Sequence, residues 1–333
     1  MRKHILLLVV TLVLSSVVVV GNSVGDEAGK VYTFNLSHHV PLSHPLQDWS
    51  LNLSKIAKEK SNGRLVIDVF GAGQLGGLKD NTEGVGYGTI DMAIIDFGTL
   101  GTMIPKLGSV ALPFMFDTFD HVEKFYDGEI GKELATEILE KLNVKVLNYS
   151  HGGFRVVASK RPLNSIDDFK LLKIRVPEVP VYVDTFKALG TNPTPIPWGE
   201  VYTSLQTGVV EAVENPPDGL YTTKLQEVTK YLTRTNHIYV DVMMTINKGI
   251  FESLPEDLQT ILQEASDEAT VAHRVQVIEN DTGNYADLLD SGMTETAIPS
   301  QDLKDKVSHV WGEFAAKTEG AQELIDAIRG LAD

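Results

Sequence analysis

The segment "KIRVPEVPVYVDTFKALGTNPTPIPWGEVYTSLQTGVVEAVENPP", residues 173–217, alternates strand-like and helical patterns. The β-branched run 172–176 predicts a strand, and residues 179–189 have the composition of a helix. The Pro-rich stretch 191–198 predicts a turn, which a short helix and a second strand at 209–215 follow. Strands that alternate with helices in this way are typical of an α/β fold.

The same alternation extends over most of the remaining chain. Further strand-like runs lie at 31–37, 64–70, 91–96, 144–150, 154–159 and 237–247, and helical runs lie at 45–61, 78–88 and 128–141. A helical stretch at 254–289 is long enough to brace two domains. We therefore expect two α/β domains between which the chain crosses: residues 30–152 with 237–280, and residues 153–236 with 281–333.

The amino terminus has the pattern of an export signal. Arg2, Lys3 and His4 precede an apolar run at 5–20, and small or polar residues follow it. Residues 1–25 are the predicted signal peptide, with cleavage between Gly21 and Gly25. The alternative is an uncleaved membrane anchor, because the apolar run is only slightly short of a spanning helix. Cleavage would leave a soluble protein, expected to be a monomer.

The bulk composition excludes several classes of function. The chain of 333 residues has no cysteine, which rules out disulfides, thiolate metal sites and thiol catalysis. Its formal net charge of −16 opposes binding to nucleic acid or anionic lipid through bulk electrostatics. An anion could bind only where cationic side chains are concentrated locally.

Four residues at predicted strand ends are candidates for such a site: Arg155, Arg175, Trp198 and Asn215. Ligands of open α/β sheets bind outside the carboxyl ends of strands, so residues near these ends can converge. Arginine suits a carboxylate because its planar guanidinium can donate two parallel hydrogen bonds. The pattern therefore predicts a carboxylate-binding site.

Each candidate also has a purely structural interpretation. Arg175 could form a salt bridge with Glu178, and Arg155 could pair with Asp167 or Asp168. The tryptophan could be a core aromatic, and the asparagine could cap a turn. Judged one at a time, these residues do not distinguish a binding site from ordinary packing.

Two other motifs point to cofactors and are rejected. "GAGQLG", residues 71–76, matches a dinucleotide fingerprint, but Asp91 opens the next strand where the ribose-binding acid should close it. His38, His39 and His44 share one loop without a metal-ligand spacing, so we expect them to line a pocket rather than hold a metal. No cofactor and no catalytic nucleophile with a suitably spaced base is predicted.

Taken together, the motifs resemble the solute-binding subunits of tripartite ATP-independent periplasmic (TRAP) transporters, the DctP-type family. The resemblance rests on the opening segment, on "GAGQLGG" with "GYGTIDMAI", and on "LPEDLQTILQEA" at the start of the long helix. It covers roughly residues 30–325. One departure is "VVEAVENPP", where many relatives have D-G-Q before E-N-P.

The resemblance implies a two-domain periplasmic-binding-protein-like architecture with crossover strands and a long domain-spanning helix. It implies a periplasmic protein that closes over a small organic acid and passes it to the TRAP membrane subunits. The residues that correspond to family binding positions are Arg175 for the substrate carboxylate, with Arg155, Asn215, Trp198, Asp96, Phe97, Ser37, His38 and His39 around it.

The substrate class stays open at this point. Trp198 could stack on a sugar ring, and Asp96 with the histidine loop could bind hydroxyls, which favours a hexuronate or a related sugar acid. The alternatives are a C4-dicarboxylate held between Arg155 and Arg175, or another hydroxy or 2-oxo acid. An exported enzyme is the rival class of function.

Overall fold

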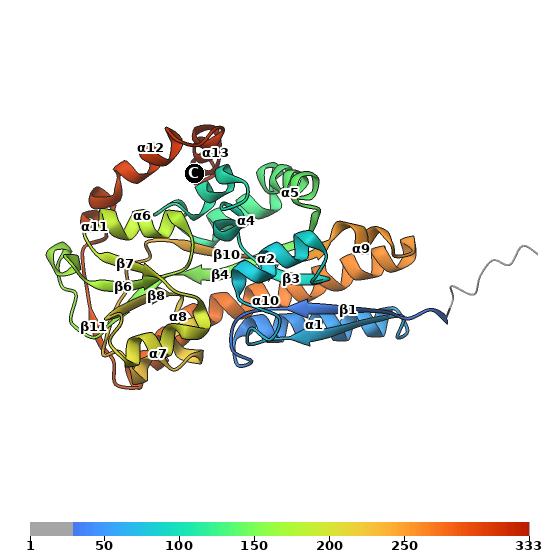
Figure 1. Ribbon diagram of the computed structural model, residues 1–333, viewed down its shortest axis with the longest axis horizontal. Helices are drawn as coiled ribbons and strands as arrows, with labels where there is room; N and C mark the ends of the chain where they lie inside the picture. Colours follow the sequence, from blue (N-terminus) through green and yellow to red (C-terminus); the bar gives the residue numbers. More distant parts are fainter. Residues whose placement is uncertain (1–28, 333) are drawn as a thin grey trace, which may run out of the picture. The chain divides into compact units, whose positions relative to one another are not determined.

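In the computed structural model, residues 29–332 are described, and they form two β-sheets flanked by helices (Figure 1). The predicted signal peptide lies outside the described residues. Within the described range, no helix is both long enough and apolar enough to cross a bilayer. The α/β class predicted from the sequence is confirmed.

The first sheet has the strand order β2-β1-β3-β10-β4. Its strands are β1 (Tyr32–Ser37), β2 (Leu65–Phe70), β3 (Met92–Ile95), β4 (Val144–Phe154) and β10 (Tyr239–Asn247). β1 is parallel to β2 and β3, whereas β10 is antiparallel to β3 and β4. The late strand β10 therefore returns to the sheet that the first part of the chain builds, as the sequence predicted.

The second sheet has the strand order β11-β9-β5-β8-β6-β7. Its strands are β5 (Val156–Ser159), β6 (Lys173–Val176), β7 (Asn192–Pro195), β8 (Ala212–Asn215), β9 (Tyr231–Thr233) and β11 (Thr294–Thr296). β6 is parallel to both β7 and β8. The carboxyl ends of β6 and β8 therefore meet at one edge of the sheet.

The helices cover both sheets. The α-helices are α1 (Pro45–Lys60), α2 (Leu78–Tyr87), α3 (Phe97–Leu100), α4 (Phe119–Asp127), α5 (Glu129–Leu142), α6 (Pro180–Ala188), α7 (Val201–Gln206), α8 (Pro217–Thr222), α9 (Lys248–Glu252), α10 (Glu256–Asp290), α11 (Ser300–Val307), α12 (His309–Ala315) and α13 (Ala321–Arg329). The 3₁₀ helices are η2 (Pro105–Ala111), η3 (Ile166–Phe169), η4 (Trp198–Glu200) and η5 (Leu225–Glu227).

The described chain passes between the two sheets three times, twice through short segments and once through a long helix. Arg155 is the residue between β4 and β5, and residues 234–238 connect β9 to β10. The third connection is α10, a helix of 35 residues that contacts α1, β4 and α8 (Figure 1). Because α1 packs on the first sheet and α8 follows β8 of the second, α10 spans both halves, as expected from the sequence.

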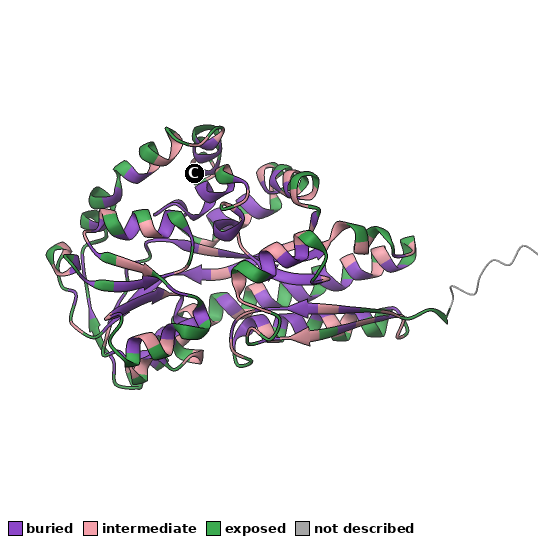
Figure 2. Ribbon diagram, in the orientation of Figure 1, coloured by how far each residue is buried: buried purple, intermediate pink, exposed green. Residues whose placement is uncertain are grey.

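The apolar core has two clusters, and each contains residues from both sheets. Figure 2 shows that most strand residues are buried. One cluster includes Ile95 and Val157, and the other includes Ile94 and Val156. Residues alternate across a strand, so neighbours on β3 and on β5 face opposite clusters. Residues 31–333 form one compact unit, and the division into two domains by residue ranges stays a prediction.

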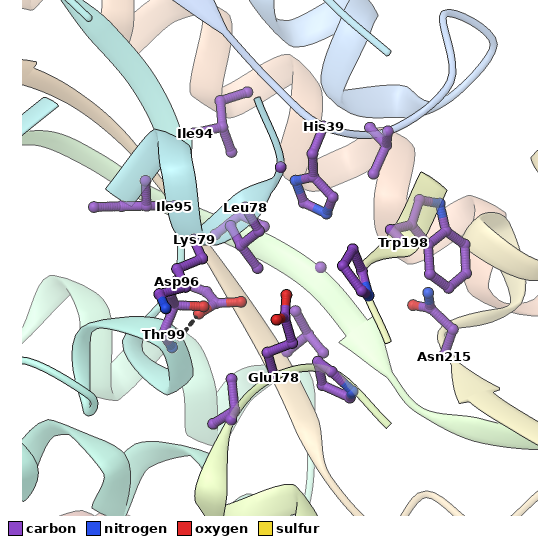
Figure 3. A pocket seen from close by; sticks show the side chains of 18 of the residues that line it. His39, Leu78, Lys79, Ile94, Ile95, Asp96, Thr99, Glu178, Trp198 and Asn215 are labelled. Carbon is purple, nitrogen blue, oxygen red and sulfur yellow. Dashed lines mark hydrogen bonds between the residues drawn. The ribbon is translucent and has the colours of Figure 1, made fainter. Parts of the chain in front are cut away.

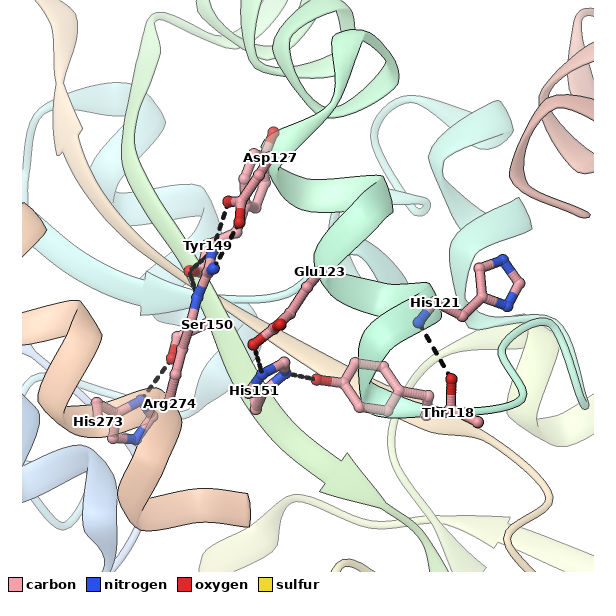
Figure 4. A network of polar contacts seen from close by, with 10 residues as sticks. Thr118, His121, Glu123, Asp127, Tyr149, Ser150, His151, His273 and Arg274 are labelled. Carbon is pink, nitrogen blue, oxygen red and sulfur yellow. Dashed lines mark hydrogen bonds and ion pairs between the residues drawn. The ribbon is translucent and has the colours of Figure 1, made fainter. Parts of the chain in front are cut away.

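A polar network fixes α10 against β4 (Figure 4). Arg274 donates to both carboxylate oxygens of Asp127, at 2.8 and 2.9 Å, and to the carbonyl of Tyr149. His273 Nδ1 and Ser150 Oγ are 2.7 Å apart, and the imidazole stacks on the Trp49 ring at 4.6 Å. These contacts tie the long helix to the strand that leads into the first crossing.

The main departure from the sequence prediction is β7, because residues 191–198 were expected to form a turn. Residues 192–195, "NPTP", instead pair with β6 as the edge strand of the second sheet. Proline is compatible with an edge strand, where one side of the backbone has no neighbouring strand to bond. The strands β9 and β11 and the carboxyl-terminal helices were not predicted either.

Candidate binding site

A cavity of 540 Å³ lies where the carboxyl ends of strands from both sheets face each other (Figure 3). This volume is within the usual range for sites that bind small molecules. The first sheet contributes His39 after β1 and Asp96 after β3, and the second contributes Glu178 after β6 and Asn215 at the end of β8. Figure 3 shows Asp96 and Thr99 on the opposite side from Trp198 and Asn215.

Arg155 lines the cavity, but its guanidinium is already paired. Its Nε and Nη2 donate to the two carboxylate oxygens of Glu214, and Nη2 also donates to the backbone carbonyl of that residue at 2.8 Å. Burial opposes ionisation of Glu214, but Arg155 and His237 together lower its pKa. The expected partners Asp167 and Asp168 are not bonded to Arg155, so that interpretation is wrong.

Arg175 lines the same cavity and is 3% exposed. Its Nε donates to the carbonyl of Ile196 at 2.8 Å, and its guanidinium carbon lies 5.2 Å from the centre of the Trp198 ring. Within residues 29–332 it forms no ion pair, with Glu178 or with any other carboxylate. Burial lowers its pKa to about 9, although the charges of Glu214 and Glu178 act in the opposite direction, so the group is cationic at neutral pH without a hydrogen-bonded counter-charge.

Trp198 and Asn215 form one wall of the cavity. Trp198 begins η4 and is 8% exposed, and its Nε1 is buried without a partner in the described chain. Asn215 ends β8, where Pro216 follows it. Both residues line the cavity, and Trp198 also belongs to one apolar cluster. Their role in ligand binding stays a prediction.

Asp96 and Phe97 follow β3 but differ in their surroundings. Asp96 lines the cavity and caps α3, since the Thr99 N–H donates to its Oδ1 at 2.6 Å. Burial raises the pKa of Asp96. Phe97 is fully buried in the apolar core beside Phe125 and Tyr149, and it does not line the cavity.

The three histidines of the loop also differ in whether they line the cavity. His39 lines the cavity, and its Nδ1 is buried without a partner within residues 29–332. His38 is fully buried, bonds Gln47 through Nε2 at 2.7 Å and does not line the cavity. His44 does line the cavity and caps α1. Burial lowers the pKa of both His39 and His44 to about 3, so neither adds positive charge at neutral pH.

Several cavity residues escaped the sequence reasoning: Lys79, Glu178, Tyr182 and Asp218 line the cavity, and Glu214 neutralises Arg155 from behind it. Glu214 is the first residue of the E-N-P motif and Asp218 lies two residues after it, which was a usable signal. Lys79 and Tyr182 lie on helices, where nothing in their spacing marks them. No cluster of three or more potential metal ligands occurs in the described part of the chain.

Two sheets joined by crossing segments, with one cavity between strand ends, define a two-domain solute-binding protein. The sequence model of the family "Bacterial extracellular solute-binding protein, family 7" (DctP) matches residues 36–318. The chain therefore belongs to this family, the DctP-type solute-binding subunits of TRAP transporters, and the resemblance stated above is confirmed.

Individual relatives agree with this assignment. The chain is 31% identical over 262 residues to the sialic acid-binding periplasmic protein SiaP of Vibrio cholerae, covering 79% of this chain and 82% of that protein. It is 32% identical over 301 residues to the C4-dicarboxylate-binding periplasmic protein DctP of Rhodobacter capsulatus, covering 88% and 89%. A TRAP periplasmic solute-binding protein from Sulfitobacter sp. NAS-14.1 with bound β-D-galacturonate superimposes with a TM-score of 0.87 at 26% identity, covering 90% and 100%.

Proposed function

We propose that this protein captures a hydroxylated monocarboxylate, a hexuronate or related sugar acid, and delivers it to TRAP membrane subunits. The observation that carries the proposal is the contrast between the two buried arginines. Arg155 is paired with Glu214, whereas Arg175 forms no ion pair among the described residues and lines the cavity. One carboxylate bound to Arg175 would form the ion pair that it lacks, at about 1.5 to 3 kcal/mol for each charge-assisted hydrogen bond.

The carboxylates that line the cavity favour a ligand with one carboxylate over a ligand with two. Beside the two arginines and Lys79, six carboxylates line the cavity: Asp80, Glu83, Asp96, Glu178, Glu200 and Asp218. A second carboxylate on the ligand would face this acidic lining. Hydroxyl groups would instead find hydrogen-bond acceptors there, which supports a sugar acid.

The residues around Arg175 suit the rest of such a ligand. The Trp198 ring packs against the guanidinium, and it offers an apolar surface and an unpartnered Nε1–H donor. Asn215 can donate and accept through its amide. Asp96 on the far side, and His39 between the two sides, can bind hydroxyls. The relative with bound galacturonate has the same fold, which supports this substrate class.

A C4-dicarboxylate is the second candidate, because one relative is named for that ligand. Lys79 lines the cavity and is the side chain that could hold a second carboxylate. The Arg155–Glu214 pair argues against the clamp of two arginines considered from the sequence. Another hydroxy acid or a 2-oxo acid would use Arg175 in the same way.

The remaining expectations follow from the family. Its members are periplasmic solute-binding proteins, so this protein acts in the periplasm. We propose that residues 1–25 are removed as a signal peptide during export. We propose that it acts as a monomer and releases its ligand unchanged. No catalytic nucleophile and base are assigned to it, so an exported enzyme is the weaker hypothesis.

A thermal-shift screen of the mature protein tests the proposal. D-galacturonate, D-glucuronate, L-galactonate, D-gluconate, succinate, malate and 2-oxoglutarate are each added, and hits are titrated by calorimetry. A ligand that binds only the native state raises its melting temperature. We expect the largest shifts among the hydroxylated monocarboxylates. Shifts confined to the dicarboxylates would contradict the proposed class, and conversion of a hit to a product would indicate an enzyme.

A further inference from the structure

His44 and Asp218 face each other in the cavity from different parts of the chain. His44 is the N-cap of α1, which packs on β2 of the first sheet, and Asp218 lies in α8, directly after β8 of the second. Both line the cavity and both are buried, at 8% and 4% exposed. His44 Nε2 and Asp218 Oδ2 are 3.5 Å apart.

The protonation of His44 follows from its contacts. Its Nδ1 accepts a hydrogen bond from the Leu46 N–H at 3.2 Å, which satisfies one free donor of the α1 amino terminus. Burial lowers the pKa of His44 to about 3, so the ring is neutral near pH 7. A neutral imidazole carries one hydrogen, and it is on Nε2 because Nδ1 is an acceptor. The Nε2–H donor faces Asp218.

Asp218 supplies a hydrogen-bond acceptor, in contrast to the donor on His44. Its Oδ1 accepts from the Gly219 N–H at 2.6 Å. Its Oδ2 is buried, and no group among residues 29–332 forms a hydrogen bond with it, because the His44 nitrogen is too far for a good one. Burial raises the pKa of Asp218 to about 7. The pair therefore consists of one donor and one acceptor, and the acceptor lacks a close partner.

We propose that His44 and Asp218 form a hydroxyl-binding subsite that determines which sugar acid the cavity accepts. This inference rests on the proposed function, since it concerns the part of the ligand distant from its carboxylate. Because His44 Nε2 and Asp218 Oδ2 are 3.5 Å apart, one hydroxyl oxygen can lie about 2.8 Å from both atoms. It accepts from His44 Nε2–H and donates to Asp218 Oδ2.

Other ligand groups fit the pair less well. A carboxylate or phosphate ionised at neutral pH has no hydrogen to donate to Asp218 Oδ2, and the ionised fraction of Asp218 would repel it. An ammonium group could donate to Asp218, but it has no acceptor for His44, whose N–H dipole would point at the cation. A methylene would leave Oδ2 buried without a partner. Only a group that both donates and accepts satisfies the two side chains together.

The test is a double-mutant cycle between protein and ligand. The probe is whichever of D-galacturonate, D-gluconate and L-galactonate raises the melting temperature most, together with its monodeoxy analogues. The variants are Asp218→Asn, which keeps the side-chain shape, and His44→Asn, which can still cap α1 but loses the Nε2–H donor. Affinities are measured by calorimetry, and Asp302→Asn, at an exposed position on α11 outside the cavity, is the matched control.

One monodeoxy analogue is expected to bind wild-type protein about tenfold more weakly than the full sugar acid. Against Asp218→Asn and His44→Asn, the same analogue and the full sugar acid should bind almost equally. If every variant weakens both ligands by the same factor, the pair only braces α1 against α8 and the subsite is refuted.

Two further outcomes separate this inference from the proposed function. If no single hydroxyl matters to wild-type protein while a sugar acid still binds, the subsite fails and the proposed function stands. If none of the three probes raises the melting temperature, both fail. The comparison of analogues on wild-type protein is informative even if a variant does not fold.

Discussion

Arg155 donates from Nε and Nη2 to the carboxylate of Glu214, and the two charges cancel inside the wall of the cavity. His237 lies on the other side of that carboxylate, with Nε2 at 3.2 Å. This arrangement leaves Arg175, of the two buried arginines in the cavity wall, as the one without an ion pair among the described residues. It also makes the pair a structural part of the site, because either partner alone would be a buried charge.

The first prediction concerns this pair. Glu214→Gln leaves Arg155 buried without its counter-charge, so the free energy of unfolding should fall by about 3 kcal/mol. Urea unfolding followed by circular dichroism measures the change. Glu133→Gln, on the exposed face of α5, is the control and should unfold like wild type. An unchanged midpoint for Glu214→Gln would show that the pair contributes nothing to stability.

Removal of the Glu214 charge should also change ligand preference. With Arg155 uncompensated, the cavity gains a second cation, so the ratio of succinate to hexuronate affinity should rise. Calorimetric titration of both acids into the folded variant measures the ratio. A ratio equal to that of wild-type protein would contradict the explanation of monocarboxylate selectivity given above.

The second prediction concerns Arg175. Arg175→Lys replaces a planar group that can donate two parallel hydrogen bonds by an ammonium, and it removes the Nε bond to Ile196. Carboxylate affinity should therefore fall about tenfold or more. Affinity is measured by calorimetry with the best hit of the screen. Arg161→Lys, whose side chain does not line the cavity, should bind like wild type. Equal binding by both variants would refute the assigned role of Arg175.

The third prediction concerns the crossing between the sheets. Gly153 has φ +104°, a conformation that L-residues rarely adopt, and an added Cβ would lie 3.3 Å from the Pro216 Cβ. Gly153→Ala should therefore lower the free energy of unfolding by about 1 to 3 kcal/mol. Gly199→Ala is the control, because its Cβ would meet no atom within 4 Å. Equal stability of the two variants would show that the backbone at 153 is not constrained.

The fourth prediction concerns the response to acid. Burial lowers the pKa of His273 well below its usual value, so in the folded state the ring stays neutral. The unfolded chain takes up a proton near pH 6.5, and acid therefore favours unfolding. The stability that depends on neutral His273 is present above about pH 6.5 and is lost as the pH falls below it.

The variant His273→Gln isolates this effect. It should be less stable than wild type at pH 7, because it loses the stacking on Trp49, but its melting temperature should fall less between pH 7 and pH 5. His309→Gln, at an exposed position on α12, should fall as much as wild type. Identical falls for His273→Gln and wild type would contradict the assigned protonation.

The sequence alone was sufficient for the elements with strong periodicity. The predicted strands at 31–37, 64–70 and 237–247 and the long helix at 254–289 agree with the structure to within two residues at each end. Their apolar patterns are dictated by burial on one face or on both, which is a local property of the chain. The strand "NPTP" had no such pattern, because it gains its place by pairing with β6 at the sheet edge.

The site was predictable where a motif marks a position. Arg175, Trp198 and Asn215 follow from the motif, and the structure places all three on the cavity. The ion-pair partner of Arg155 could not be predicted from the sequence, because Asp167 and Asp168 are much nearer to it along the chain than Glu214 is. The antiparallel register of β5 and β8 places Val156 opposite Asn215, which brings Glu214 to the guanidinium from 59 residues away.

By itself the sequence determined the α/β class and the family, and it predicted an arginine for a carboxylate, because hydrophobic period and motif spacing are written along the chain. Tertiary structure alone decided which of the two arginines is free, and it brought His44 and Asp218 to 3.5 Å from opposite parts of the chain. The reason is that charge compensation and hydrogen-bond partners depend on distances across the fold, which sheet register and helix packing set.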